Sequence, residues 1–128
     1  MKICVIDDDP MMLSHLEDML TGLGHEVVTA PDVDTGLRSV ETQGSDAAVV
    51  DILMPEQDGL TFLMQIRAIK LQIRLVAMTG GGRLGAGPLL KMASGLGADA
   101  TLVKPFSSTE LELALDPSTG SESRLQAN

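Results

Sequence analysis

Aromatic residues and cysteine are scarce in this sequence. Its 128 residues include no tryptophan, no tyrosine, two phenylalanines and one cysteine, Cys4. Sites that bind single-stranded nucleic acid stack bases on aromatic rings, so this class of site lacks its main component. One cysteine cannot form an internal disulfide framework, and the position of Cys4 within an apolar run indicates a buried, unreactive thiol.

Basic residues are also few. Nine Lys and Arg face eighteen Asp and Glu, which gives a formal net charge of −9 at pH 7. This sign opposes electrostatic binding to nucleic acid or anionic lipid, so we expect protein partners and no direct contact with nucleic acid or membrane. Only four apolar residues separate Lys2 from Asp7, too few for a signal peptide or a membrane span, so a cytoplasmic location is expected.

Short, uniformly apolar runs alternate along the chain with segments of helical periodicity. Runs that are apolar throughout are typical of parallel strands covered by helices on both faces. The predicted strands are Lys2 to Ile6, Val27 to Thr29, Ala47 to Val50, Ile73 to Met78 and Ala100 to Val103. The predicted helices are Asp9 to about Gly22, Asp32 to Gln43, Gly59 to Lys70, Pro88 to Gly95 and Ser107 to Leu115.

This strict alternation predicts an α/β fold with a doubly wound parallel sheet and right-handed crossovers. One domain over residues 1–115 accounts for all the predicted elements. Residues 116–128, DPSTGSESRLQAN, are rich in Ser and lack apolar periodicity, so we expect a disordered polar tail. In such a sheet, ligands collect at the carboxyl ends of the strands.

Three adjacent carboxylates, Asp7, Asp8 and Asp9, follow the first predicted strand and precede Pro10. Like charges at this spacing repel one another. A bound divalent cation would relieve the repulsion, because hard cations prefer carboxylate oxygens. A solvated cluster at a helix start is the alternative, since Asp is favoured at helix caps. These residues alone leave both interpretations open, although Asp9, next to Pro10, fits a cap best.

The other predicted strands also end in polar residues. Asp51 follows the third strand, Thr79 the fourth and Lys104 the fifth. Together with the acidic cluster, these groups would meet at one edge of the sheet. A carboxylate can accept a phosphoryl group, while a cation, an ammonium group and a hydroxyl stabilise the charge on the transferred oxygens. The arrangement therefore predicts a phosphoryl-transfer site with Mg²⁺ or Mn²⁺.

Residues 1–115 resemble a response-regulator receiver domain of two-component signalling. The matching stretches are ICVIDDDPMM, AAVVDILMPEQDGL, LVAMTG and GADATLVKPF. The resemblance implies a flavodoxin-like sheet of order 2-1-3-4-5 with five helices. It also implies a phosphoryl donor that is a histidine kinase or a histidine phosphotransfer protein, and a downstream protein target. We expect a single-domain regulator that is not an enzyme beyond its own phosphorylation and dephosphorylation.

The same resemblance assigns roles to individual residues. Asp51 would be the phosphoacceptor, Thr79 would bind the phosphoryl group and move on activation, and Lys104 would pair with it. The implied metal ligands are Asp7, Asp8, Asp51 and the backbone carbonyl of Leu53. The Lys104-Pro105 bond would be cis, as is typical of the family.

The sequence departs from the family at its switch. Receivers usually carry an aromatic residue three positions before the lysine, and here that residue is Thr101. The segment after Thr79 is unusually rich in glycine and includes Gly80, Gly81 and Gly82. Because glycine imposes little backbone preference, we expect this segment to carry the signal in place of the aromatic ring.

Two other interpretations use the same residues. A haloacid-dehalogenase-type phosphatase also has Asp-x-Asp after an apolar strand, and Asp7 and Asp9 have that spacing. Such an enzyme needs a further acidic pair after Lys104, but the acids there do not follow a predicted strand. A pseudo-receiver that binds partners without switching is the other interpretation. The intact set of acids argues against it.

Overall fold

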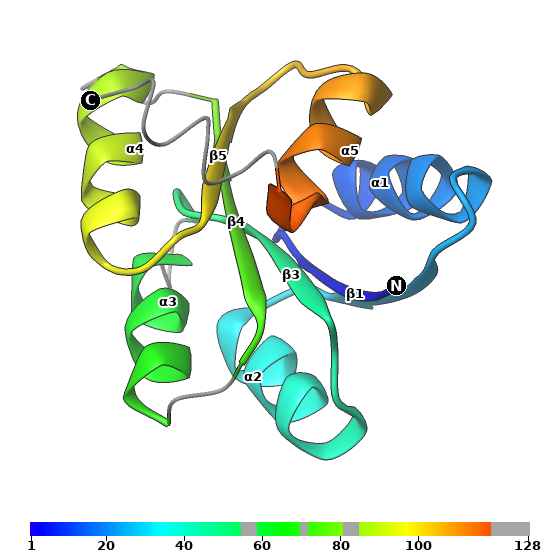
Figure 1. Cartoon of the computed structure of the whole chain (residues 1–128), viewed down its shortest axis with the longest axis horizontal. Coiled ribbons are helices and arrows are strands. Elements are labelled where there is room, and N and C mark those ends of the chain that lie inside the picture. The colour runs from blue at the N-terminus through cyan, green and yellow to red at the C-terminus, as the bar shows by residue number, and fades with distance from the viewer. Residues whose placement is uncertain (55–58, 70–71, 81–84, 119–128) are drawn as a thin grey trace.

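The computed structural model describes residues 1–54, 59–69, 72–80 and 85–118, and these form one five-stranded sheet flanked by helices (Figure 1). Strands and helices alternate along the chain, as predicted. The strands are β1 (Lys2–Ile6), β2 (Glu26–Ala30), β3 (Ala47–Asp51), β4 (Arg74–Thr79) and β5 (Ala100–Val103). The helices are α1 (Pro10–Gly22), α2 (Val33–Gln43), α3 (Gly59–Ala68), α4 (Ala86–Gly95) and α5 (Ser108–Leu115).

The sheet is parallel, with strand order β2-β1-β3-β4-β5, which confirms the predicted flavodoxin-like topology. Helices α1 and α5 cover one face of the sheet, and α2, α3 and α4 cover the other (Figure 1). Each face has its own apolar core. Because β1, β3 and β4 are interior strands buried on both sides, their sequences are apolar without alternation.

Side-chain caps, of which the one at Asp9 was predicted, explain where three helices begin. The Asp9 carboxylate accepts a hydrogen bond from the backbone N–H of Met11 at 2.9 Å, and Pro10 is the first residue of α1. Asp32 caps α2 by accepting from the N–H of Thr35. Ser107 and Glu110 form a reciprocal capping box at the start of α5. These local contacts confirm the three predicted starts.

Some element boundaries differ from the predictions. Strands β3 and β4 each extend one residue further, because Asp51 and Thr79 still pair with Met78 and Val103 of the neighbouring strands. Helix α3 ends at Ala68, two residues before the predicted end. Helix α4 begins at Ala86 rather than at Pro88, since proline is tolerated within a first turn. No helix in the described part of the chain is long and apolar enough to cross a membrane.

Candidate functional site

The polar residues at the strand ends gather at the carboxyl edge of the sheet. Asp7 follows β1, Asp51 ends β3, Thr79 ends β4 and Lys104 follows β5. The side chains of Asp7, Asp51 and Thr79 are buried, whereas Asp8 is exposed. Parallel strands of this order place these residues side by side, so the topology assembles a site from segments far apart in the sequence.

Three carboxylates form an acidic cluster: Asp7, Asp8 and Asp51. One oxygen from each lies within 4.8 Å of the others, and among the described residues this is the only such group of potential metal ligands. The Lys104 amine lies 3.0 Å from Oδ2 of Asp7 and 3.0 Å from Oδ2 of Asp51. One ammonium therefore bridges the two buried carboxylates, and the cluster retains an excess of negative charge.

Backbone donors hold the second oxygen of each buried carboxylate. The N–H of Asp9 donates to Asp7 Oδ1 at 3.0 Å, and the N–H of Leu53 donates to Asp51 Oδ1 at 2.9 Å. Both contacts arise because the chain turns sharply just after a strand. Contacts from two sides thus fix the orientation of each carboxylate. A carboxylate that is already oriented loses less conformational freedom when a reacting group approaches.

The close approach of α3 also shapes the site. Gly59 begins this helix, and a Cβ at that position would overlap the carbonyl oxygen of Asp51 and the side chain of Val50. Glycine is therefore required for α3 to start directly against the end of β3. The neighbouring residues 55–58 lie outside the described residues.

Burial and charge perturb the titration of two site residues. Burial raises the pKa of Asp51, and the contacts with the Leu53 N–H and Lys104 offset this only in part. Burial by itself lowers the pKa of Lys104, but hydrogen bonds to Asp7 and Asp51 outweigh it, so the pKa of Lys104 is raised. Lys104 is consequently protonated at neutral pH, and ionised Asp51 carries a desolvation cost.

The Asp51 desolvation cost predicts a stability change. Because its folded-state pKa lies above 3.8, the folded state binds more protons than the unfolded state between the two values, and stability falls as pH rises through this window. We expect Asp51→Asn to be more stable than the parent in EDTA at about pH 7, and the difference to vanish by about pH 3.5. Urea unfolding followed by circular dichroism measures both. A variant that is less stable at neutral pH would contradict the burial argument.

The donor set fits a hard divalent cation. Carboxylate oxygens converge from Asp7, Asp8 and Asp51, and exposed Asp8 leaves one side open to water. Mg²⁺ commonly binds through one or two carboxylates and keeps several waters, which matches a partly open cluster. The Leu53 side chain is 47% exposed at this edge. Coordination by its carbonyl remains a prediction.

The structure separates Asp9 from the acidic cluster. Its carboxylate caps α1, as the contact with Met11 shows. The described acids that follow Lys104 are Glu110, Glu112 and Asp116, and they lie in or just after α5 rather than at a strand end. The alternative phosphatase site, which requires Asp9 as a working carboxylate, is therefore not assembled.

The predicted switch residues are only partly within the described structure. Thr79 is buried, Gly80 is exposed, and Thr101 in β5 is half-buried opposite Ala77. Gly81 and Gly82 lie outside the described residues. The Lys104-Pro105 bond is cis, as the resemblance implied.

A pocket beside Lys104 was not foreseen from the sequence. It has a volume of about 330 Å³ and is lined by Met12, His15, Lys104, Pro105 and Phe106. Residues of α1 and of the segment after β5 contribute to it, and these segments are about 90 residues apart in the chain. No local pattern in the sequence marks such a pocket, because it depends on how α1 packs against that segment.

Comparison with known proteins is consistent with this geometry. A family model described as response regulator receiver domain matches residues 3–116. The alkaline phosphatase synthesis transcriptional regulatory protein PhoP of Bacillus subtilis is 33% identical over 110 residues, which cover 86% of this chain and 45% of PhoP. The chain thus spans about half the length of this relative.

Two solved structures have the same fold over most of the chain. A response regulator receiver domain protein from Clostridium thermocellum is 31% identical, with a TM-score of 0.81 and coverage of 97% of this chain and 98% of that one. The response regulator TrrA from Thermotoga maritima, in complex with Mg²⁺-BeF, is 28% identical, with a TM-score of 0.75 and coverage of 87% and 92%.

Proposed function

Because this chain belongs to the response regulator receiver family of two-component systems, we propose that Asp51 accepts a phosphoryl group from a histidine kinase or a histidine phosphotransfer protein. The observation that carries the proposal is the convergence of buried Asp51 with Asp7, Asp8 and Lys104. A chain of this kind is a phosphoacceptor rather than an enzyme acting on separate substrates.

The side chains account for the transfer chemistry. A carboxylate oxygen of Asp51 forms a bond to phosphorus while the bond from phosphorus to the donor nitrogen breaks. Lys104, already 3.0 Å from Asp51 Oδ2, stays protonated and offsets the negative charge that arrives with the phosphoryl oxygens. The buried hydroxyl of Thr79 lies at the end of the adjacent strand, where we propose that it donates to a phosphoryl oxygen.

We propose that Asp7, Asp8 and Asp51 hold Mg²⁺ or Mn²⁺ with the Leu53 carbonyl. When bound, the ion neutralises phosphoryl oxygens during transfer. The Mg²⁺-BeF complex of TrrA from Thermotoga maritima supports this assignment by similarity. The excess negative charge of the cluster supports it from the residues themselves, because one Lys104 amine offsets only part of three carboxylates.

Partners are proposed to be proteins. The net charge of −9 opposes direct binding to nucleic acid by this domain, although the relative PhoP of Bacillus subtilis is named as a transcriptional regulatory protein. The pocket lined by Met12, His15 and Phe106 adjoins Lys104 and offers an apolar contact to a phosphoryl donor docked over Asp51. A cytoplasmic location is part of this proposal, since histidine kinases present their phosphohistidine there.

A small phosphodonor tests the function without a known kinase. Incubation with acetyl phosphate and Mg²⁺ should add one phosphoryl group by intact-mass analysis, and incubation with EDTA in place of Mg²⁺ should add none. An adduct that forms equally well in EDTA would contradict the proposed metal dependence. Absence of any adduct with acetyl phosphate and with phosphoramidate would contradict the phosphoacceptor role.

Loss of the phosphoryl group is predicted to be slow. The residues two positions after Asp51 and Thr79 are Leu53 and Gly81, and neither has an acid or amide to orient an attacking water. Replacing Leu53 by Asn and Gly81 by Glu together should shorten the half-life of the adduct by roughly a hundredfold, the lower end of the range for a positioned acid or base. Mass analysis over time after removal of the donor measures the half-life. An unchanged decay would refute the prediction.

We also propose that the signal leaves through the segment after Thr79. With Thr101 in β5, no large ring lies at the position where receivers usually carry one. Movement of Thr79 toward a phosphoryl oxygen would displace Gly80 and the chain that leads to α4. Hydrogen exchange with Mg²⁺ and beryllofluoride, which stands in for the phosphoryl group, should show protection over residues 80–95. Protection confined to β5 and α5 would contradict this route.

A further inference from the structure

Charge is distributed unevenly along this acidic chain. Residues 59–98 contain no aspartate and no glutamate, so all eighteen acidic residues lie outside this stretch. The same stretch contains five of the nine basic residues: Arg67, Lys70, Arg74, Arg83 and Lys91. A chain with a net charge of −9 therefore includes one long segment whose charged side chains are all basic.

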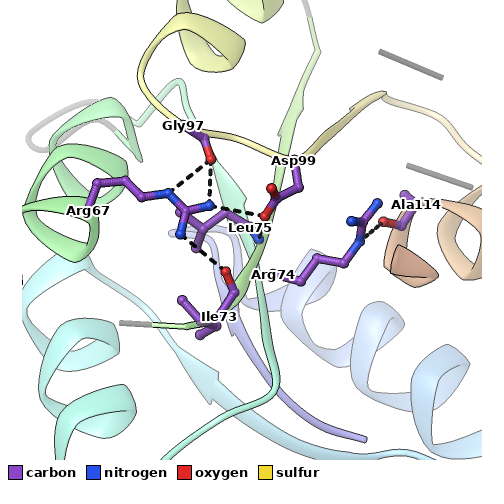
Figure 2. Close-up of polar contacts among 7 residues, drawn as sticks. All are labelled: Arg67, Ile73, Arg74, Leu75, Gly97, Asp99 and Ala114. Atoms are coloured by element: carbon purple, nitrogen blue, oxygen red, sulfur yellow. Dashed lines mark hydrogen bonds and ion pairs between the residues drawn. The ribbon is translucent and has the colours of Figure 1, made fainter. Parts of the chain in front are cut away.

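The fold brings the two helices of this stretch together. Helices α3 and α4 cover the same face of the sheet, on the side away from α1 and α5 (Figure 1). Their buried side chains belong to one apolar core. Arg74, at the start of β4, is directed elsewhere, because its Nε donates to the Ala114 carbonyl of α5 at 2.8 Å (Figure 2). Lys91 of α4 is exposed.

Arg67 shows which flank of α3 is turned toward α4. Its Nη2 donates to the carbonyl of Gly97, in the turn after α4, at 2.7 Å (Figure 2). Met64 and Leu60 precede Arg67 by three and seven residues, so helical periodicity places them on the same flank. Leu60 is half-buried and Met64 is 56% exposed. This flank is therefore apolar and partly open to solvent.

Helix α4 turns an apolar flank toward α3. The two helices connect parallel strands and cover the same face of the sheet, so they run in the same direction. Two parallel helices face each other with opposite sides of their buried stripes. On α4 the buried stripe includes Leu89 and Ala93, and the flank toward α3 carries Pro88 and Met92. Pro88 is exposed, and Met92 is 50% exposed.

We propose that these two flanks bind an amphipathic helix of a partner protein whose apolar stripe is bordered by acidic side chains. We call the surface the α3–α4 face and define it by Leu60, Met64, Pro88, Lys91 and Met92. Interfaces have an apolar centre and a charged rim, and methionine is enriched in them because its side chain adapts to its partner. Apolar positions at helical spacing on a partner helix match such a surface.

Charge favours an acidic partner for this face. An acidic helix would meet Lys91 and no acidic side chain from residues 59–98. A single helix contacts this face alone, and charges elsewhere on the domain are screened over a Debye length of about 10 Å. A nucleic acid or an anionic membrane is an extended polyanion, so the net charge of −9 opposes it. The inference goes beyond the proposed function, because it concerns a surface that needs no phosphoryl group to form.

A synthetic helical peptide tests the face directly. The probe has Leu at every third or fourth position and Glu elsewhere, and its control has Lys in place of each Glu. The protein is labelled with ¹³C at the methyl groups of its eight methionines, and methyl spectra are recorded during titration. We expect the acidic peptide to shift the Met64 and Met92 signals. Met11 is the matched control, since it is 80% exposed but lies on α1.

Substitutions on the face should weaken binding of the acidic peptide. Lys91→Glu places like charges across the interface, so we expect a loss of about tenfold or more in affinity, and Lys91→Gln should lose less. Met64→Gln with Met92→Gln should also cost about tenfold or more, because the apolar centre is lost. Met11→Gln should have no effect. The Lys91 variants decide the matter if the double methionine variant does not fold.

Several results would overturn the proposal. These are equal shifts at Met11, equal binding of the lysine peptide, no binding of the acidic peptide, or affinity unchanged in about 1 M salt, where the Debye length is about 3 Å. Shifts caused by phosphatidylglycerol vesicles but not by the peptide would identify a membrane surface instead. Shifts that follow protein concentration without peptide would identify a second copy as the occupant.

The proposed function is tested separately on the same proteins. All variants of the α3–α4 face should form the phosphoryl adduct with acetyl phosphate to the same extent as the parent. Loss of peptide binding with the adduct retained would confirm that the two sites are independent. Absence of the adduct in the parent would contradict the phosphoacceptor role and leave the peptide result as the test of this face.

Discussion

Asp51→Asn should abolish the phosphoryl adduct that the parent forms with acetyl phosphate and Mg²⁺. An amide lacks the anionic oxygen that forms the bond to phosphorus, and Asn is close to Asp in shape, so the surrounding contacts are retained in outline. The expected loss is complete, because Asp51 is the one acceptor proposed for this site: it ends β3, which lies between β1 and β4, so its carboxylate lies between Asp7 and Thr79 and beside Lys104. Intact-mass analysis measures the adduct directly.

The matched control for Asp51→Asn is Asp9→Asn. Asp9 is close in sequence to the cluster but serves as the α1 cap, and asparagine caps helices about as well as aspartate. This variant should therefore form the adduct to the same extent as the parent. An undiminished adduct in Asp51→Asn would place the acceptor elsewhere, and peptide mapping would then locate it.

Apart from Asp51→Asn, Asp8→Asn should weaken Mg²⁺ binding more than any other single replacement of an acidic residue by its amide. Asp8 is the exposed member of the cluster, so it can reach an ion without displacing the Lys104 contacts that occupy Asp7 and Asp51. Opposite unit charges about 4 Å apart attract by roughly 4 kcal/mol near a protein surface, so a loss of well over tenfold in affinity is expected. Calorimetric titration suits this chain, which has no tryptophan or tyrosine to report binding by fluorescence.

The same substitution should not destabilise the metal-free fold. It removes one charge from a crowded group of carboxylates, so the free energy of unfolding in EDTA should stay equal or rise. Asp9→Asn again serves as control, because it removes the same charge one residue away. Equal Mg²⁺ affinity in Asp8→Asn and the parent would show that the site model is wrong.

The order and type of the elements could be predicted because their signals are local. Apolar runs such as Ala47 to Val50 identify interior strands, and caps such as Asp9 and Ser107 fix helix starts through contacts within three residues. Boundaries that depend on neighbouring strands were less predictable. Asp51 and Thr79 belong to their strands only because Met78 and Val103 lie opposite them.

The residues of the candidate site could also be picked out from the sequence. A parallel doubly wound sheet brings the carboxyl ends of its strands to one edge, so Asp7, Asp51, Thr79 and Lys104 had to lie near one another once the fold was recognised. Their chemical types then predicted phosphoryl transfer. The sequence by itself thus determined the fold class and the membership of the site.

Only the tertiary structure decided how these residues are held. The bridge from Lys104 to Asp7 and Asp51 joins residues 97 and 53 positions apart. The guanidinium of Arg67 likewise contacts the Gly97 carbonyl and the Asp99 carboxylate, 30 and 32 positions away (Figure 2). Such contacts depend on side-chain directions and on distances of a few ångströms across packed elements. Sequence periodicity carries information about one element at a time, so it cannot specify which guanidinium meets which carbonyl on another.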